Sequence, residues 1–183
     1  MARAATGAET GNTSVARENV FALAKTILAL VASGKDPRAT GGSDLVAEFL
    51  QQYVYDGQIG NAAFLNDDFW GVLALRAAGV FADHPSLIGA KEAILRAQHT
   101  NGGWSYTTVP DFPDTDDTAA SIMALLELGM PTSDPVIVRA FSYLSASQNT
   151  DGGFPNVPPG PSSVDSTAWV AMALQKAGLD VSR

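Results

Sequence analysis

The sequence predicts an all-α fold in which helical hairpins follow one another around an incomplete ring of about seven main helices. Three observations support this prediction. The chain repeats itself at a period of about 50 residues, each repeat contains two helical segments of different polarity, and a glycine follows the second segment each time. Periods of this length are typical of arrays in which each unit buries its apolar face against the next.

The repeat is clearest in the second half of the chain. Two pairs of segments match at offsets of 50 and 49 residues: QHTNGGW (98–104) with QNTDGGF (148–154), and DDTAASIMALLELG (116–129) with DSTAWVAMALQKAG (165–178). A degraded copy covers residues 66–79, and a partial copy covers residues 19–34. The chain therefore contains about three and a half copies of one unit.

The first helix of each unit is amphipathic. Residues 135–147 place four apolar side chains on one stripe, which predicts a half-exposed outer helix: Ile137, Ala140, Phe141 and Leu144. Ser133 or Asp134 is expected to cap it, with Pro135 in the first turn. The same signals predict outer helices near 44–54 and 85–98, capped by Ser43 or Asp44 and by Asp83 followed by Pro85.

The second helix of each unit is apolar or small on nearly every face. Residues 116–128 and 165–177 have this composition, which predicts helices that are buried on several sides. We therefore expect them to form an inner layer, with Met123 and Met172 as core side chains. A glycine that can close a helix follows each inner segment: Gly34, Gly79, Gly129 and Gly178.

Composition limits the function. The 183 residues, 46% apolar and 16% charged, are expected to form one globular domain over residues 15–183 after a disordered leader, residues 1–14. The net charge of −8 argues against nucleic acid as a partner. The apolar run at residues 20–32 contains Lys25 and is too short to span a membrane. No cysteine is present, so disulfides and thiolate chemistry are excluded.

The segment RAFSYLSASQNTDGGF (139–154) carries a family resemblance. Its order of basic, alanine, aromatic, leucine, glutamine, glycine and aromatic residues resembles the QW repeat of squalene and hopene cyclases, with Phe154 in place of the usual tryptophan. Over residues 16–183 the chain resembles the αα-toroid repeats of terpenoid cyclases, protein prenyltransferases and prenyltransferase-like bacterial proteins, which implies an α/α toroid-like array.

Four residues of this repeat are given a structural role: Gln98, Trp104, Gln148 and Phe154. The glutamine at the end of an outer helix is expected to hydrogen-bond backbone groups of the neighbouring unit, while the aromatic ring covers that contact. Repeat arrays require such interfaces between neighbours.

The segment DTDD (114–117) matches the DxDD motif of class II terpene cyclases. The resemblance implies that Asp116 protonates a carbon–carbon double bond or an epoxide. Asp114 and Asp117 would then supply the like charges that keep this acid protonated. Trp70, Tyr106 and Trp169 are the candidate ligand-binding aromatic side chains, because aromatic faces shield carbocations.

The next unit favours a simpler interpretation of the same motif. The segment SVDSTAW (163–169) keeps Asp165 and Thr167 but lacks the other acidic residues. A recurring aspartate without acidic companions is typical of a helix N-cap, so we interpret Asp116 and Asp165 as caps. A helix N-terminus lowers the pKa of a carboxyl group, which is the opposite of what a proton donor needs.

Other sites receive less support from the sequence. Zinc-dependent prenyl transfer needs a ligand set that this chain lacks, since it has no cysteine and only two histidines, His84 and His99; we therefore expect no cofactor. Asp67 and Asp68 align with Asp117 and Thr118 and are interpreted as the start of a helix. A calcium site would require four aspartates to approach one another: Asp111, Asp114, Asp116 and Asp151.

Two classes of function follow from these patterns. The first is a binding or scaffolding module with an apolar central cavity for an isoprenoid-like small molecule, and the second is a terpenoid cyclase-like isomerase that uses Asp116. An incomplete ring leaves its end units uncovered, so a homodimer, the remainder of a larger protein or a partner domain is expected to cover them. The resemblance to bacterial repeat proteins implies an extracytoplasmic location if the chain is a fragment.

Overall fold

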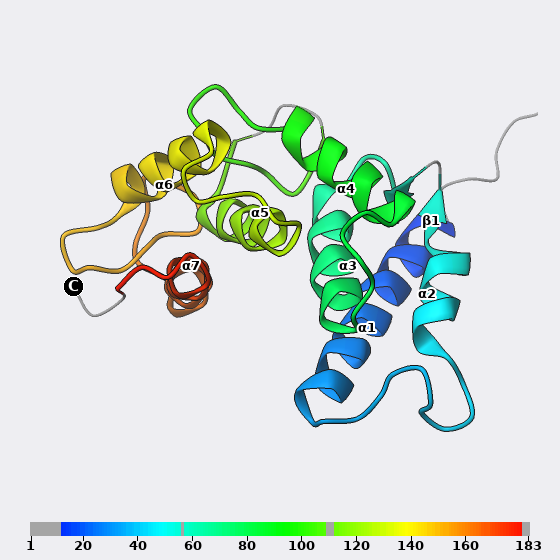
Figure 1. Cartoon of the computed structure of the whole chain (residues 1–183). Helices are drawn as coiled ribbons and strands as arrows, with labels where there is room; N and C mark the ends of the chain where they lie inside the picture. The colour runs from blue at the N-terminus through cyan, green and yellow to red at the C-terminus, as the bar shows by residue number, and fades with distance from the viewer. Residues whose placement is uncertain (1–11, 56, 109–111, 181–183) are drawn as a thin grey trace, which may run out of the picture.

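The computed structural model describes residues 12–55, 57–108 and 112–180. Within these residues the chain forms seven α-helices and one small antiparallel hairpin (Figure 1). The elements are, in order, α1 (Asn12–Ala32), α2 (Leu45–Gln52), β1 (Val54–Tyr55), β2 (Gln58–Ile59), α3 (Leu65–Ala77), α4 (Pro85–Arg96), α5 (Thr115–Glu127), α6 (Pro135–Ser147) and α7 (Val164–Lys176). The predicted all-α fold is confirmed.

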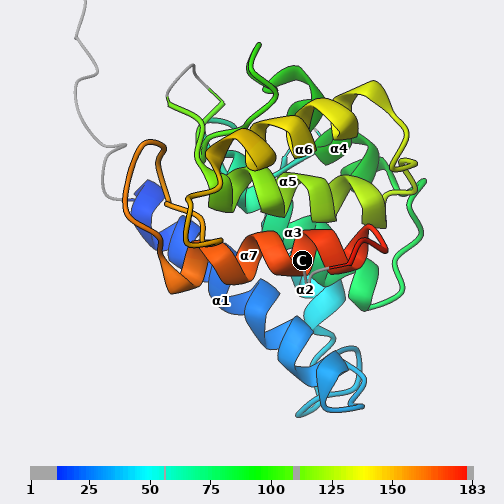
Figure 2. The same ribbon diagram turned by 90° about the vertical axis from the view of Figure 1, so that its left-hand side faces the viewer.

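The helices form two layers. In the inner layer α1 packs on α3, α3 on α5 and α5 on α7. Figure 2 shows α5 and α7 running side by side, with α3 behind them. Each outer helix packs on the inner helix that precedes it, so that α2 contacts α1, α4 contacts α3 and α6 contacts α5. The alternation of inner and outer helices that the two polarity patterns predict is therefore present.

Burial differs along the inner layer. In α5 every residue from Thr118 to Leu125 is buried, because α3, α6 and α7 all pack against this helix. Helix α7 is the last inner helix, and Val164, Ala168 and Met172 on it are exposed. Met123 lies in the core as predicted, whereas the prediction for Met172 is wrong, since half of that side chain is exposed.

The helix starts agree with the sequence in part. Asp44 and Asp134 cap α2 and α6 as predicted. His84, rather than Asp83, caps α4, because its Nδ1 accepts a hydrogen bond from the Ser86 N–H at 3.3 Å. Helix α1 begins at Asn12, within the predicted leader, and residues 1–11 lie outside the described residues.

Asp114 caps α5, and Ser163 occupies the same position before α7. Each of these residues pairs with the closing aromatic residue of the preceding turn, since the Asp114 N–H donates to the Trp104 carbonyl and the Ser163 N–H to the Phe154 carbonyl. This pairing holds the residue in the extended conformation that a cap requires. The prediction that Asp116 and Asp165 are the caps is therefore wrong; both lie in the first helical turn.

One backbone amide is fixed in the same way in three units. The Trp104 N–H donates to the Thr118 hydroxyl at 3.0 Å, and the Phe154 N–H donates to the Thr167 hydroxyl at 3.0 Å. In the unit that contains α3, the β1–β2 hairpin replaces the glycine-rich turn, and the Ile59 N–H donates to a carboxyl oxygen of Asp68 at 3.0 Å. A carboxyl group thus stands where the other two units use a hydroxyl.

The C-terminal ends of the inner helices are bonded to cationic side chains. Arg38 donates to the Ala78 carbonyl, and Arg76 donates to the Glu127 carbonyl at 2.9 Å. Lys176 pairs with the Glu127 carboxylate. A left-handed glycine ends each inner helix as predicted, with φ between 73° and 80°: Gly34, Gly79, Gly129 and Gly178. Among the described helices, none is both long and apolar enough for a membrane span.

Candidate functional site

The acidic cluster at the start of α5 is built around Asp114. Its carboxylate accepts a hydrogen bond from the Asp117 N–H at 2.7 Å, and the two side chains also hydrogen-bond each other. Asp114 is only 7% exposed, whereas Asp116 and Asp117 are half-buried. The structure therefore brings the three predicted acids together, with the first of them at the centre.

Burial raises the pKa of Asp114. Hydrogen bonds from Asp117 oppose this shift, and the neighbouring charge of Asp116 adds to it. Desolvation is the largest of these effects, so the net pKa lies above the ordinary value for an aspartate. The raised pKa thus belongs to Asp114, whereas the resemblance to the cyclase motif implies that Asp116 is the proton donor and Asp114 a supporting residue.

Asp116 lies on a distinctive face of its helix. Counted within the repeat, Trp70 and Trp169 both occupy the position of Ala120, four residues after Asp116. Residues four apart share one face of a helix and lie about 6 Å apart along its axis. Asp116 is therefore on the face of α5 that corresponds to the tryptophan-bearing faces of α3 and α7.

The inner helices carry a cluster of aromatic side chains, which we call the inner aromatic cluster: Phe21, Trp70 and Trp169. The rings of Trp70 and Trp169 meet edge to face at 5.5 Å, and Phe21 meets Trp70 at 6.4 Å. The Lys25 ammonium lies 5.2 Å from the centre of the Trp70 ring. These side chains come from α1, α3 and α7, and the three rings are half-buried.

Tyr106 has other neighbours. Its ring stacks on Phe64, just before α3, with the ring centres 6.2 Å apart. Its carbonyl accepts the Leu65 N–H at 2.8 Å. Tyr106 therefore contacts Phe64, whereas Trp70 and Trp169, the other two predicted ligand-binding residues, contact each other.

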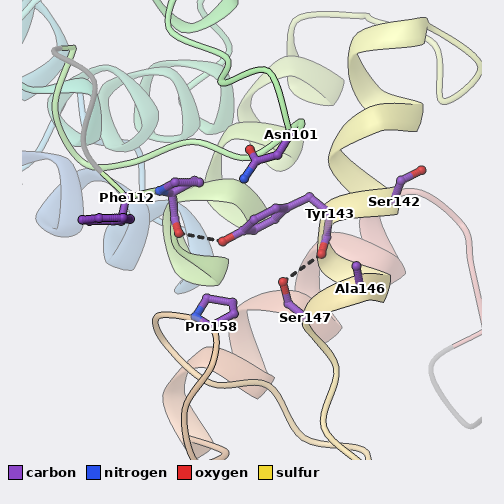
Figure 3. A pocket seen from close by; sticks show the side chains of 8 residues that line it. Asn101, Phe112, Ser142, Tyr143, Ala146, Ser147 and Pro158 are labelled. Atoms are coloured by element: carbon purple, nitrogen blue, oxygen red, sulfur yellow. Dashed lines mark hydrogen bonds between the residues drawn. The ribbon is translucent and has the colours of Figure 1, made fainter.

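A cavity of about 440 Å³ lies beside Tyr143, between α6 and two loops (Figure 3). The Tyr143 hydroxyl donates to the Pro113 carbonyl at 2.6 Å. Burial, together with the charge of Asp114, raises the pKa of Tyr143 to about 12. None of the residues that line this cavity belongs to the inner aromatic cluster. The lining residues are Asn101, Phe112, Pro113, Ser142, Tyr143, Ala146, Ser147 and Pro158. Sequence reasoning missed Tyr143, although it is the aromatic residue of the repeat motif.

We expect Tyr143→Phe to lower the free energy of unfolding by about 1 kcal/mol, because the Pro113 carbonyl loses its donor. Urea denaturation would measure this change. Tyr55→Phe is the matched control, since that hydroxyl also donates to a backbone carbonyl but its side chain is 60% exposed. Equal effects of the two substitutions would contradict a specific role for the Tyr143 contact.

Asp67 and Asp68 are both fully buried in the first turn of α3. Asp68 accepts hydrogen bonds from the Ile59 N–H and from the Gln58 amide, and Asp67 accepts one from the Asn61 N–H. Desolvation raises the pKa of Asp68 to about 8 in spite of its hydrogen bonds. Their place at a helix start agrees with the sequence, but their burial was not predicted. The recurring threonine at the Asp68 position, which bonds the preceding turn, is the signal that could have indicated it.

No cluster of three or more potential metal-ligating side chains occurs within residues 12–55, 57–108 and 112–180. Asp111, one member of the predicted calcium set, lies outside the described residues. Asp151, another member, is exposed and accepts hydrogen bonds from the Ser162 hydroxyl and the Gly153 N–H, which lower its pKa.

The two-layered helical structure and comparison with known proteins support a terpenoid cyclase-like helical domain. The chain is 33% identical to a squalene–hopene cyclase from Alicyclobacillus acidocaldarius over 115 residues, which cover 53% of the chain and 17% of the cyclase. It is 34% identical to a drimenyl diphosphate synthase from Streptantibioticus cattleyicolor over 84 residues, which cover 45% of the chain and 16% of the synthase.

The matched region spans about one sixth of the length of each of these two relatives. No model of a protein family matches the chain. The similarity therefore extends to a terpenoid cyclase-like helical domain.

Proposed function

We propose that the chain is a terpenoid cyclase-like repeat module that binds an apolar, isoprenoid-like molecule at the inner aromatic cluster without converting it. The observation that carries the proposal is the meeting of Phe21, Trp70 and Trp169, which come from three inner helices and are each half-buried. Large aromatic faces that are neither fully buried nor isolated provide an apolar contact area for a ligand.

The electrostatic surroundings favour an uncharged ligand. The chain has a net charge of −8, and among the described contacts of this cluster Lys25 is the basic group, lying over Trp70. Acidic side chains in the first turn of α5 add negative charge at one end of the inner helices. A neutral isoprenoid is therefore a better match than a diphosphate.

Isothermal titration calorimetry with farnesol tests this function. We expect saturable binding to the wild-type protein, and an affinity at least about tenfold lower for Trp169→Ala, which removes the ring in contact with Trp70. Tyr106→Ala is the control, because its ring contacts Phe64 instead, and its affinity should equal that of the wild type. Absence of binding to the wild type, or a loss confined to the Tyr106 variant, would overturn the proposal.

The second candidate function is a cyclase-like isomerase, favoured by the position of Asp116 on the helix face that corresponds to the two tryptophans. The raised pKa of its neighbour Asp114 agrees with an acidic cluster that holds protons. Incubation with squalene or farnesol, followed by mass spectrometry, distinguishes the two functions. Cyclised products that disappear in Asp116→Asn would establish the enzyme. Binding without products, together with unchanged affinity in Asp116→Asn, would establish the module.

A further inference from the structure

The cavity beside Tyr143 lies where four segments of the chain meet. Its lining comes from the last two turns of α6, from the turn of residues 98–104, and from the loops that precede α5 and α7. Its volume of about 440 Å³ is within the range of small-molecule sites, which is about 300–1,000 Å³. Because the inner aromatic cluster contributes none of the lining, a ligand in this cavity is independent of the isoprenoid proposed above.

The Tyr143 ring is held in a fixed position in this cavity. A Cβ atom at Gly103 would be 3.1 Å from the Cε1 and Cζ atoms of the ring, so the bare glycine backbone packs closely against it. The rest of the ring is half-buried and lines the cavity. In Figure 3 the ring lies between Asn101 and Ser147, and its hydroxyl end points toward Phe112.

The hydroxyl groups of the lining have all donated their hydrogens. Tyr143 donates to the Pro113 carbonyl at 2.6 Å, Ser147 to the Tyr143 carbonyl at 2.8 Å, and Ser142 to a carbonyl one turn back on α6 at 3.0 Å. A hydroxyl group has one hydrogen and two lone pairs, so these oxygens can only accept a hydrogen bond from a ligand. The Asn101 amide, whose oxygen accepts a backbone N–H at 3.2 Å, is the donor of the lining. The three hydroxyl oxygens therefore favour a ligand that carries donors.

The charges around the cavity favour a cation. The last turn of α6 lines the cavity with the negative end of the helix dipole and contains no basic side chain. The positive end of α5 is capped by Asp114, whose charge also acts on the Tyr143 hydroxyl. None of the described lining residues carries a charge, and Arg139, the basic residue of α6, is bonded to Gln98 instead. The net charge of −8 favours the same sign of ligand.

Phe112 adds a second aromatic ring at the edge of the cavity. The residue is 80% exposed, although large apolar side chains are usually buried. The face of an aromatic ring carries partial negative charge and attracts a cation that lies within about 6 Å of its centre. Phe112 and Tyr143 therefore give the cavity the aromatic surface that organic cations bind, in addition to its hydroxyl acceptors.

We propose that this cavity binds a primary alkylammonium group, with the ammonium beside the rings of Phe112 and Tyr143. The carbon chain of the ligand then lies against Pro113, Ala146 and Pro158. A primary ammonium has three N–H donors and no acceptor, which matches the hydroxyl oxygens of the lining, and it is charged at neutral pH. A free amine and the lysine side chain of another polypeptide share this chemistry.

Titration of the ¹⁵N-labelled whole protein with n-butylammonium chloride, followed by NMR, tests the proposal. We expect saturable shifts of the Asn101 side-chain amide and the Ser147 backbone amide, with a dissociation constant on the order of 1–10 mM for so small a ligand. 1-Butanol, which has the same chain without the charge, should bind at least about tenfold more weakly, and sodium butyrate should not bind. Equal binding of butanol, preferential binding of butyrate, or shifts that do not saturate would overturn the proposal.

Substitution of Phe112 tests the role of its ring. Phe112→Ala should weaken butylammonium binding by about threefold to tenfold, and Phe112→Tyr, which keeps an aromatic face, should bind as the wild type does. Phe81→Ala is the matched control, because Phe81 is 78% exposed but lies in the loop between α3 and α4 and does not line the cavity. Equal affinities of Phe112→Ala and Phe81→Ala would contradict the proposal. Urea midpoints equal to that of the wild type would show that the variants are folded.

A second ligand distinguishes the two sources of the ammonium group. N-acetyl-lysine methylamide presents the same group on a lysine side chain with peptide bonds on both sides. Binding at least about tenfold tighter than that of n-butylammonium would assign the cavity to a lysine of another polypeptide, and weaker binding would assign it to a free amine. Either result requires that the Phe112→Ala protein binds the tighter ligand less well than the wild type does.

Discussion

Gly102→Ala should lower the free energy of unfolding by about 2–5 kcal/mol. Two effects add up at this position. Gly102 has a φ of 94°, a conformation that costs a residue with a Cβ atom about 1–2 kcal/mol. The new Cβ atom would also lie 2.4 Å from the Arg139 carbonyl oxygen, so that the backbone of α6 has to move, which costs about 1–3 kcal/mol more.

Gly152→Ala separates these two effects. Gly152 has a similar φ of 84°, but its Cβ position has no described atom within 4 Å. We therefore expect a loss of only about 1–2 kcal/mol, from the backbone conformation alone. Urea denaturation of both variants, followed by circular dichroism, gives the difference directly. Equal losses would show that the turn of residues 98–104 does not pack as closely against α6 as the structure describes.

The stability of the protein should fall as the pH rises from about 4 to about 8, with Asp68 as a main cause. The Asp68 carboxyl has an ordinary pKa of 3.8, which applies to the unfolded chain, and a pKa of about 8 in the folded protein, where it is fully buried. Between these two values the folded protein holds a proton that the unfolded chain has released. The contribution of Asp68 is thus complete below pH 4 and is lost as the pH approaches 8, at about 1 kcal/mol per pH unit.

Asp68→Asn tests this pH dependence, because an amide has the shape of the carboxyl group but does not titrate. Its oxygen can accept the Ile59 N–H, and its NH₂ group can face the Gln58 side-chain oxygen after that amide turns over. We expect the variant to match the wild type near pH 5 and to exceed its free energy of unfolding by about 3 kcal/mol near pH 8. Urea denaturation at several pH values measures both.

Asp165→Asn is the control for this experiment, since Asp165 also lies in the first turn of an inner helix but is exposed. Its substitution should leave the slope of stability against pH nearly as in the wild type. If the Asp68 variant keeps the slope of the wild type between pH 5 and 8, then Asp68 is ionised in the folded protein and the prediction is wrong.

The layer arrangement could be predicted because one short-range signal recurs three times along the chain. An amphipathic helix that begins at a polar capping residue, followed by an apolar helix that ends at glycine, assigns outer and inner positions without any knowledge of distant contacts. The order of helices in the structure agrees with these signals. The helix caps were less predictable, because whether Asp114 or Asp116 starts α5 depends on a pairing with Trp104 that is ten residues away in sequence.

The burial of Asp68 could not be read from its alignment with Thr118 alone. A threonine hydroxyl and an aspartate carboxylate are both good first-turn residues, so local preference does not distinguish a surface acid from a buried one. The hairpin of β1 and β2, which delivers the Ile59 N–H to this carboxyl group, has only two residues in each strand. Strands of that length are too short for an alternating pattern to appear in the sequence.

The contacts at the C-terminal ends of the inner helices have a consequence for the whole molecule. Because repeated units place inner helices in parallel, their peptide dipoles add rather than cancel. Acidic side chains in the first turns of α5 and α7 oppose the positive pole, while Arg38, Arg76 and Lys176 oppose the negative pole. The two ends of the inner helices are therefore compensated by side chains of opposite charge, so the summed dipole of the layer is reduced at both ends.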